Sequence, residues 1–456
     1  MECEGSGNIH TALSRWCKLL YKHLDFDREL GMISVAILGA GPAGLTAAIS
    51  AAETARNQGI HSSIVVFEKN PDPGRKLLIT GSGQCNLTNN SNETIEGGSG
   101  KDTFQNLEKF LSHYGSKLQA RFLKTSFYSF TNRDAINFFQ NLGVPITVRN
   151  DGKVFPASFR AADILGALLH RCSEMGVKIS CSSPVSRIEK HANGFAIHMR
   201  ESEIKFFQKI IIAVGGYTYP ATGSTGDGYL FAKYLGHTIV LPKPALSGVT
   251  VSHHKLSSLS GISFENIDMT LWRTGKKILS ISGDMLITHT GFSGPAVVNN
   301  SREIHIGDEL VFDFSRQDES FLKKLQKEIQ QSGNSQISTI VQKCGIPKRL
   351  SDKILEIHHV DGRKKCAEIT KKDLRAINEA CTSWKHTAAS AGKVTNAMVT
   401  AGGVSIKEVH SRTMQSRITP GLFFAGEVLD IDGETGGYNL QAAFSTGMLA
   451  GKSAVV

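Results

Sequence analysis

The chain of 456 residues is long enough for about three domains, or for two domains of which one carries a large insertion. Its composition, with 40% hydrophobic and 20% charged residues, is that of an ordinary globular protein and excludes a long disordered chain. No window approaches the roughly 20 apolar residues of a membrane span. The net charge of +10 suits an anionic ligand and also non-specific nucleic-acid binding, so it does not choose between them.

The first 31 residues differ in character from those that follow. Leu13, Trp16, Leu20 and Leu24 have helical spacing, which predicts a short amphipathic helix in an N-terminal extension; an upstream start codon would also explain this segment. It lacks the charged and apolar regions of a secretory signal, and none of the eight cysteines forms a Cys-x-x-Cys pair. These features predict a reduced, cytoplasmic protein with neither a metal site nor a disulfide framework.

A strand, a helix and a second strand are predicted at residues 33–38, 43–57 and 64–67, which together make a βαβ unit with parallel strands. The turn between the first strand and the helix reads Gly39-Ala40-Gly41-Pro42-Ala43-Gly44. In such a turn the first glycine permits the tight bend, the second lets the backbone approach a pyrophosphate, and the third lets helix and strand pack closely. The motif therefore predicts a dinucleotide whose anion lies at the N-terminus of the helix.

An acidic residue, Glu68, follows the second strand. An acid at this place binds the ribose hydroxyls of an adenosine, and its charge would repel a 2′-phosphate. We therefore expect Glu68 and the adjoining Lys69 at the adenosine end of the site, and no preference for NADP there. The alternative, a glycine-rich turn followed by a solvated glutamate, leaves the order of strand, turn, helix, strand and acid unexplained.

Further elements are predicted along the rest of the chain. Residues 91–101 form a polar loop, and helices are expected at 134–142 and 161–176. Residues 177–214 alternate like a small sheet that ends in an apolar strand at 210–214. Beyond them, residues 242–314 are predicted to be β-rich and residues 319–382 to be helical. Residues 394–426 are predicted to return to strands, and a final helix is expected at 438–451.

The helical stretch carries a basic excess, with 14 basic residues against 8 acidic ones between Arg316 and Arg375. Such an excess usually marks a solvated face. The alternative is a contact surface for RNA or DNA, although no RNA-binding signature accompanies it. The residues concerned are Lys323, Lys324, Lys327, Lys348, Arg349, Lys364, Lys365, Lys371 and Lys372.

Two further segments indicate FAD rather than NAD as the dinucleotide. Residues 74–89 form a glycine-rich stretch shortly after the acid. Residues 421–447 combine a strand ending in Ala425-Gly426-Glu427, a glycine-rich turn and a helix, an order that resembles the closing motif of flavoproteins with two dinucleotide-binding domains. In those proteins an acid binds the ribityl chain, and the last helix points its N-terminus at the flavin pyrimidine ring.

Five ordered motifs make the resemblance more specific: residues 74–89, 215–228, 288–295, 400–404 and 426–447. Together they resemble the BaiN/YhiN-like flavoproteins, also described as NAD(P)/FAD-dependent oxidoreductases or aminoacetone-oxidase-like proteins, over about residues 32–455. The resemblance implies an α/β fold in which a Rossmann-type FAD/NAD(P)-binding domain is interrupted by an insert with a β-barrel-like part and a helical part. The family's bile-acid member is associated with the reduction of steroid double bonds.

The expected domains follow from this resemblance. They are an N-terminal extension (residues 1–31), the first part of the FAD-binding domain (32–242), a β-rich insert (243–318), a basic helical insert (319–393) and the C-terminal return of the FAD-binding domain (394–456). The residues expected to bind FAD lie in the turns and helix starts described above. They are Gly39, Gly41, Pro42, Ala43, Gly44, Glu68, Lys69, Arg75, Lys76, Gly81, Gly83, Cys85, Asn86, Gly215, Gly426, Glu427, Gly436, Gly437, Tyr438, Asn439 and Leu440.

Three residues depart from the family pattern. Gln84 stands where members carry an arginine, Ser82 replaces a glycine, and Val214 interrupts the usual Ala-Thr-Gly-Gly segment. The missing arginine removes a strong anion clamp, so an anionic substrate is not carried over from the family. FAD binding should survive, because the remaining glycines and Arg75 are intact.

Several side chains allow alternative interpretations. Arg75 and Lys76 face the pyrophosphate or a substrate anion, or are solvated loop cations. Cys85 is either a redox thiol or, as we favour, a small residue that fills a tight loop, since no resolving cysteine is near it in sequence. His289, as a proton donor, and Tyr438 are the candidates for a catalytic role, but a structural histidine explains His289 equally well.

The sequence therefore predicts a cytoplasmic FAD-dependent oxidoreductase that transfers hydride between bound flavin and a small or medium organic substrate. NAD(P)H is the expected reductant and would dock transiently, because no second glycine motif with a strand and an acid is evident. Two alternatives stay open: an oxidase that uses oxygen, and a nucleic-acid-binding flavoprotein with structural or sensory FAD. No membrane partner is expected, and the sequence specifies neither the substrate nor the oligomeric state.

Overall fold

The computed structural model describes residues 32–90, 101–199, 203–315 and 320–456, with the backbone alone for 101–105. The helix predicted near Leu13 and most of the polar loop predicted at 91–101 lie outside these residues. Among the described residues, Pro244–Met398 form one compact unit, and the stretches of chain on either side of it together form the other. No helix in the described part of the chain is long and apolar enough to cross a bilayer.

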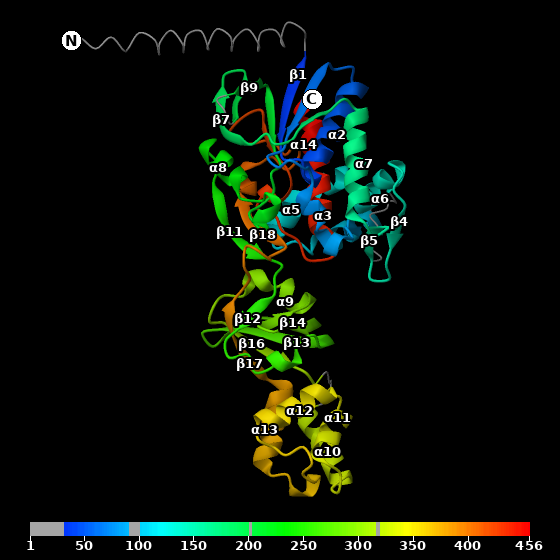
Figure 1. The fold of residues 1–456 in the computed structure, drawn as a ribbon, viewed down its shortest axis with the longest axis vertical. Helices are drawn as coiled ribbons and strands as arrows, with labels where there is room; N and C mark the ends of the chain where they lie inside the picture. Colours follow the sequence, from blue (N-terminus) through cyan, green and yellow to red (C-terminus); the bar gives the residue numbers. More distant parts are fainter. Residues whose placement is uncertain (1–31, 91–100, 200–202, 316–319) are drawn as a thin grey trace, which may run out of the picture. The chain divides into compact units, whose positions relative to one another are not determined.

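A parallel sheet of five strands forms the centre of the first unit (Figure 1). Its strands are rich in Ile, Val and Phe and are mostly buried, as is usual where helices cover both faces of a parallel sheet. In spatial order they are β19 (Leu422–Phe424), β10 (Lys209–Ile212), β1 (Ile33–Leu38), β2 (Ser62–Phe67) and β6 (Lys178–Ser180). The strands predicted at 33–38 and 64–67 are confirmed, and the one predicted at 210–214 ends two residues earlier.

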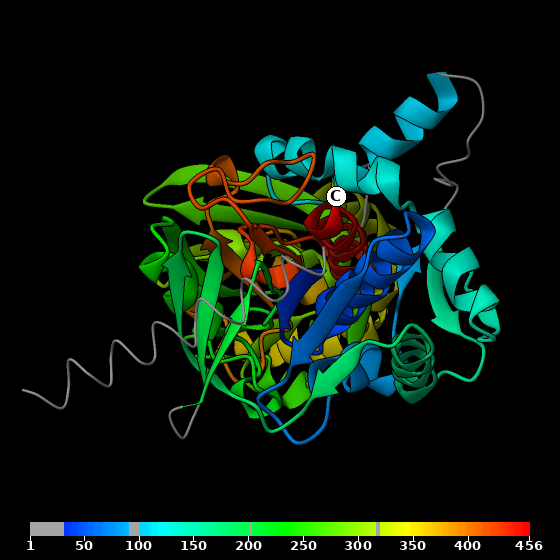
Figure 2. The ribbon, with the colours of Figure 1, turned by 90° about the horizontal axis from the view of Figure 1, so that it is seen from above.

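Two long helices, α2 (Pro42–Asn57) and α14 (Tyr438–Val455), pack against each other in this unit, and Figure 2 shows them side by side in blue and red. Their contact is made by small residues, because a Cβ atom at Gly447 or at Gly451 would overlap backbone atoms of α2. The two backbones therefore almost touch, which leaves no room for larger side chains. Both helices match the predicted ones, and α14 runs four residues beyond its predicted end.

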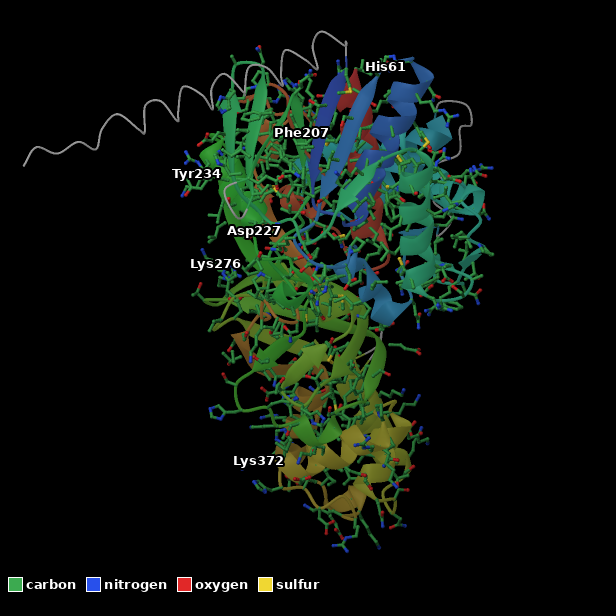
Figure 3. The ribbon with its side chains drawn as sticks, turned by 45° about the horizontal axis from the view of Figure 1, so that its top comes forward. His61, Phe207, Asp227, Tyr234, Lys276 and Lys372 are labelled. Atoms are coloured by element: carbon green, nitrogen blue, oxygen red, sulfur yellow. The ribbon has the colours of Figure 1, made fainter. Side chains whose placement is uncertain are left out.

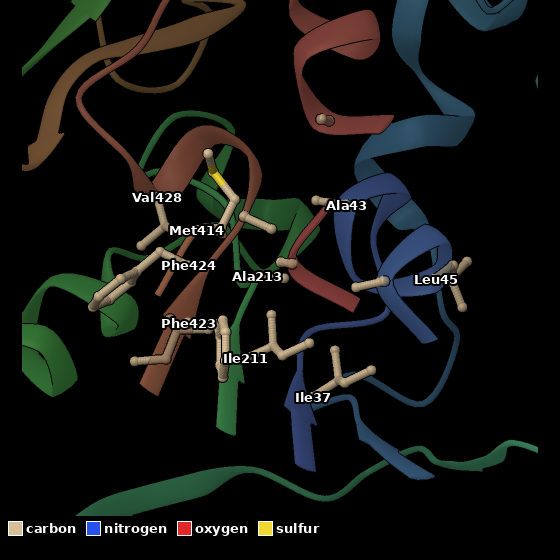
Figure 4. Close-up of a cluster of buried hydrophobic side chains, with 14 of the residues drawn as sticks. Ile37, Ala43, Leu45, Ile211, Ala213, Met414, Phe423, Phe424 and Val428 are labelled. Atoms are coloured by element: carbon tan, nitrogen blue, oxygen red, sulfur yellow. The ribbon is translucent and has the colours of Figure 1, made fainter. Parts of the chain in front are cut away.

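The hydrophobic core of the unit lies where this sheet meets α2 (Figure 4). Ile37 and Ile211 extend from the neighbouring strands β1 and β10, and Phe423 and Phe424 extend from the edge strand β19. All four side chains are buried. This packing joins the first and last parts of the chain.

Among its described residues, the first unit also contains three small sheets and six more helices. In order of pairing the strands are β3 (Thr88–Asn89), β5 (Lys153–Pro156) and β4 (Ile146–Val148); β7 (Val185–His191), β8 (Gly194–Met199) and β9 (Ile204–Phe207); and β11 (Ile239–Ala245) with β18 (Val399–Val404). The helices are α3 (Arg75–Leu78), α4 (Lys101–Leu111), α5 (Lys117–Ser129), α6 (Asn132–Asn141), α7 (Ala161–Glu174) and α8 (Asp227–Tyr234). The helices α6 and α7 match the predicted ones to within two residues, whereas α4 and α5 were missing from the prediction.

The second unit contains a closed six-stranded barrel. Buried and exposed side chains alternate along β13, apart from an irregularity after Phe264, as expected for a strand with one face inside a barrel. Around the barrel the strands are β12 (Val249–Val251), β15 (Gly291–Ser293), β14 (Lys276–Ile287), β13 (Ser263–Arg273), β16 (Glu309–Asp313) and β17 (Trp384–Ser390). The short helix α9 (Pro295–Val298) follows β15.

Four helices stand in sequence between the last two barrel strands, and their cores are continuous with that of the barrel. Phe321 and Leu325 of the helical part belong to the same buried cluster as Phe312 and Phe314 of the barrel part. The helices are α10 (Phe321–Gln331), α11 (Ile337–Lys343), α12 (Lys348–Ile357) and α13 (Lys371–Thr382). The predicted fold class, an α/β domain interrupted by a barrel-like and a helical insert, is confirmed.

Candidate dinucleotide-binding site

The residues predicted to bind a dinucleotide follow the carboxyl ends of the parallel strands. Gly39 comes directly after β1, Glu68 directly after β2, Gly215 shortly after β10 and Gly426 shortly after β19. Because parallel strands end at the same edge of a sheet, the fold brings these segments together, and ligands of open α/β sheets bind at that edge.

The glycine turn at the start of α2 combines two structural glycines with one that borders open space. Gly39 has φ +98°, and its N–H donates to the Phe67 carbonyl oxygen at 2.8 Å. A Cβ atom at Gly44 would overlap the Gly39 carbonyl oxygen, so both residues are required by the fold itself. At Gly41, in contrast, a Cβ atom would have no described atom within 4 Å. The turn thus leaves room at the N-terminus of a 16-residue helix, where an anion is favoured.

Glu68 is held against this turn and is only 7% exposed. Its Oε2 accepts the Ala40 N–H at 2.9 Å, and its Oε1 accepts the backbone and side-chain N–H groups of Asn70 at 2.9 and 2.7 Å. A carboxylate offers about four acceptor positions, so room for a ribose hydroxyl remains.

The segment 222–227 lies beside Glu68 and belongs to the same site. Asn70 Nδ2 donates to the Thr222 carbonyl oxygen at 3.2 Å, and Lys69 Nζ forms an ion pair with Asp227 at 2.6 Å. Figure 3 labels Asp227 at the start of α8. The glycine-rich stretch 215–228 therefore covers the site of the first glycine motif and does not build a second one. Lys69 is engaged with Asp227, which limits its freedom to approach a ligand.

Lys76 and Glu427 meet in the site although they are far apart in sequence. Lys76 Nζ lies 2.9 and 3.0 Å from the two Glu427 carboxylate oxygens and 3.1 Å from Thr218 Oγ1. Glu427 Oε1 also accepts the Thr400 N–H at 2.9 Å. Both charged side chains are 21% exposed, so the pair stays within reach of a ligand. Arg75, in contrast, is exposed.

Cys85 is packed inside its loop. The side chain is fully buried, the residue has φ +60°, and burial raises the pKa of its thiol to about 12. A thiol with so high a pKa carries almost no thiolate at neutral pH, which supports the small-residue interpretation over the redox one. Gly81 and Gly83 have positive φ in the same loop, and Ser82 has φ +56° in place of the family's glycine.

Two glycines of the C-terminal motif, residues 426–447, pack against earlier motifs: the glycine turn at the start of α2 and the stretch 74–89. A Cβ atom at Gly426 would lie 2.7 Å from Ala43 Cβ, and one at Gly437 would lie 2.5 Å from the Thr88 carbonyl oxygen. Asn439 fixes the preceding turn, because its side chain both accepts from the Gly433 N–H at 2.9 Å and donates to the Gly433 carbonyl oxygen at 2.8 Å. The remaining members of this motif are Gly436, whose carbonyl oxygen accepts from Asn89, and the half-buried Leu440.

The N-termini of α2 and α14 point in the same direction and are offset along the helix axes. The helices run parallel, since Gly447 lies against Ala43 and Gly451 against Ala47. At about 1.5 Å per residue, α14 therefore begins roughly 10 Å beyond the start of α2. An elongated ligand with negative charge at two points, such as a pyrophosphate and a reduced flavin ring, is complementary to two positive helix ends in this arrangement.

Two buried polar atoms in the same region have no hydrogen-bond partner among the described residues: Asn86 Oδ1 and Thr88 Oγ1. Asn86 adjoins Gly81, and Thr88 adjoins Gly437. Buried polar groups are normally paired, and a bound ligand with its own polar groups would pair these two atoms. With the open space at Gly41, they show that the residues present fit FAD. In the described part of the chain, no group of three or more His, Cys, Asp or Glu residues could hold a metal ion.

The two catalytic candidates lie in different units. The Tyr438 ring is 3% exposed and packs among Phe110, His113 and Tyr114 at the start of α14. His289 is exposed in the turn between β14 and β15 of the second unit.

A histidine absent from the sequence analysis stands at the start of α14. His113 Nδ1 lies 2.7 Å from Glu434 Oε2, and its ring stacks on Tyr438 at 4.2 Å between centroids. Only the fold pairs these residues, which are 321 positions apart, so no local spacing could have indicated them.

Comparison with known proteins identifies the family of the chain. The chain matches the family model described as HI0933-like protein Rossmann domain over residues 33–453. It is 30% identical over 440 residues to the 3-dehydro-bile acid delta(4,6)-reductase of Clostridium scindens, covering 93% of this chain and 99% of that protein. It is 30% identical over 416 residues to the ribosomal RNA dihydrouridine synthase of Haemophilus influenzae, covering 90% and 95% respectively.

Among solved structures, the chain resembles the 3-ketosteroid-delta4-(5alpha)-dehydrogenase of Rhodococcus jostii, with a TM-score of 0.50 and 14% identity. The match covers 93% of this chain and 97% of that one. At this identity the likeness concerns the fold alone.

Proposed function

Because the chain belongs to the HI0933-like Rossmann-domain family, a family of FAD-dependent oxidoreductases, we propose that it reduces a carbon–carbon double bond conjugated to a carbonyl group. Two relatives with different substrates support this reaction class. The bile-acid enzyme is a delta(4,6)-reductase, and the ribosomal RNA enzyme makes dihydrouridine, in which the double bond of the uracil ring is saturated. In both cases the reduced bond is polarised by a carbonyl group.

The parallel N-termini of α2 and α14 support the place that we propose for FAD. The open backbone at Gly41 would hold the pyrophosphate, Glu68 the ribose, and the Lys76–Glu427 pair the ribityl end of FAD. FAD, when bound, would supply hydride transfer, with NAD(P)H as the source of the electrons. The protein's part is to bind, to orient the substrate and to supply a proton.

We place the proton donor at His113. Saturating a double bond adds a hydride to one carbon and a proton to the other. A histidine whose Nδ1 is held by a carboxylate is a common proton donor, because the carboxylate fixes the orientation of the ring. His289 and Tyr438 stay predictions beside it. The variant H113N should slow product formation while leaving flavin reduction by NAD(P)H unchanged; equal slowing of both half-reactions would contradict this role.

The first test is an anaerobic titration of the purified flavoprotein with NADH and NADPH, followed by addition of a 3-oxo-Δ4 steroid or a uridine-containing ribosomal RNA transcript. Bleaching of the flavin band by a nucleotide, its return on adding the acceptor and a saturated product are expected. Return with oxygen alone would instead indicate an oxidase. A band that persists with both nucleotides would refute NAD(P)H as the reductant.

One observation favours RNA as the substrate. Seven exposed cations of the helical part have no ion pair with any described residue: Lys323, Lys327, Lys348, Lys365, Lys371, Lys372 and Arg375. Lys343, in contrast, is paired with Glu328 at 2.6 Å. Cations without partners remain available to phosphates, and Figure 3 labels Lys372 among them.

The triple variant K365Q/K371Q/K372Q tests this possibility against K343Q as a control. Weaker RNA binding and a shallower salt dependence in the triple variant alone are expected if RNA is the substrate. If the unmodified protein does not bind RNA at low salt, RNA is rejected as the substrate in favour of a small molecule.

A further inference from the structure

A hairpin outside the cofactor site holds a cavity of about 250 Å³, lined by His410, Ser411, Arg412 and Arg417. We propose that this cavity binds a phosphate group. None of its lining residues belongs to the glycine motifs or to the Lys76–Glu427 pair, so the cavity is separate from the place proposed for FAD. The inference does not depend on the reaction proposed above.

The hairpin is held in a fixed conformation. Val409 and Ser416 bridge its two arms, and Met414 lies at the turn with φ +59°. The second arm pairs with the free edge of β19: the Ser416 N–H donates to the Leu422 carbonyl oxygen at 2.7 Å, and the Phe424 N–H donates to the Met414 carbonyl oxygen at 3.0 Å. Met414 is buried in the same hydrophobic core as Val428 (Figure 4). The backbone around the cavity is therefore organised before any ligand binds, which lowers the entropic cost of binding.

The guanidinium groups of the cavity have little else to bind. Arg412 is exposed and makes no hydrogen bond or ion pair with any described residue. Arg417 uses only its Nε, which donates to the Val409 carbonyl oxygen at 3.3 Å. The nearby acid, Glu408, is already engaged, because its carboxylate accepts from the backbone N–H and the hydroxyl of Thr238 at 2.8 and 2.7 Å. The positive charge of the cavity is thus not neutralised by the hairpin.

These side chains suit a phosphate better than other ligands. Arginine presents a planar set of N–H donors that matches two phosphate oxygens, and two arginines can bind one phosphate from two sides. His410 and the Ser411 hydroxyl add further donors. The cavity volume of about 250 Å³ leaves room for the sugar attached to a phosphate. Such a group is offered by a free nucleotide or by the backbone of RNA.

The test uses the FAD-loaded protein, so that the dinucleotide site is filled. Calorimetric titration with inorganic phosphate and with adenosine monophosphate measures the free ligands, and fluorescence anisotropy with a single-stranded RNA measures the polymer. The variants are R412Q and R417Q, and the matched control is K407Q, which removes an exposed cation from the same segment without touching the cavity.

Saturable phosphate binding that weakens about tenfold in R412Q and in R417Q, but less than twofold in K407Q, is expected. A parallel loss of RNA affinity would identify RNA as the source, and unchanged RNA affinity would identify a free nucleotide. The proposal fails if the unmodified protein shows no saturable binding, or if K407Q weakens binding as much as R412Q does. Flavin content and reduction by NAD(P)H, measured on the same samples, keep this outcome separate from the function proposed above.

Discussion

Replacing Gly41 with valine should abolish FAD binding without unfolding the protein. Gly41 has φ −85° and ψ −176°, an extended conformation open to any residue, and no described atom would contact its new Cβ. Valine is a poorer residue than glycine at a helix N-cap, at a cost of up to about 1 kcal/mol, but it also restricts the unfolded chain, which offsets about 0.4–1 kcal/mol. The free energy of unfolding should therefore change by less than about 1 kcal/mol.

The loss of flavin affinity should be much larger. The valine side chain would occupy the space at the start of α2 through which a pyrophosphate reaches the backbone N–H groups. Hydrogen bonds to a charged group contribute about 1.5–3 kcal/mol each, so losing two of them weakens binding by at least about a hundredfold.

The assay is flavin content after purification, measured by absorption, together with thermal unfolding of the FAD-free protein followed by circular dichroism. The matched variant G44A should behave differently, because its Cβ would overlap the Gly39 carbonyl oxygen and should destabilise the fold itself by about 1–3 kcal/mol. Stoichiometric FAD in G41V, or an equal loss of stability in G41V and G44A, would refute the placement of the pyrophosphate.

Three further predictions concern other parts of the chain. K76M and E427Q should each weaken flavin binding, because each removes the ion pair that joins residues 74–89 to residues 426–447. A double-mutant cycle on flavin affinity should show a coupling of about 1–2 kcal/mol, and additive effects would show that the ion pair is unimportant. Burial in the barrel, with smaller contributions from His254 and Lys255, lowers the pKa of His386 to about 3, so the unfolded state binds the proton more readily and stability falls as the pH drops below about 6.5. From pH 7 to pH 5 this one residue should cost about 2 kcal/mol, and H386L should flatten that part of the stability curve measured by urea unfolding; an unchanged curve would contradict its neutral burial. Relief of the left-handed backbone in S82G should raise the free energy of unfolding by about 0.5–1 kcal/mol, measured in the same way, whereas a decrease would show that the hydroxyl group is needed.

The predictable parts of the structure are those with a local signal. A βαβ unit is predicted within about 35 residues by the apolar strands at 33–38 and 64–67 and by the glycine turn between them. The β-rich and helical stretches of the insert were predicted from the sequence pattern, and the barrel-like form of the β-rich stretch was predicted from the resemblance. In these segments the local pattern and the tertiary environment agree.

The parts beyond prediction depend on contacts between distant residues. The pairing of Lys76 with Glu427 and of His113 with Glu434 joins positions more than 300 residues apart. The helix α4 has an apolar face with Leu107, Phe110 and Leu111, so a local signal for it existed and was missed, whereas α5 is positioned by packing against α14 and against α4. The hairpin at 408–417 is fixed by its pairing with β19, which sequence spacing alone does not reveal.

The packing of α2 against α14 bears on how the protein is made. The first βαβ unit is synthesised early, but the helix that covers the small-residue face of α2 is encoded about 400 residues later, after the whole second unit. Until synthesis has passed α14, the nascent chain exposes an alanine-rich helix face and an unpaired edge of β10, both of which can associate with other chains. Binding of FAD at the proposed site would therefore have to wait until α14 has been synthesised, whereas the second unit can fold before the last strand and helix of the first unit are in place.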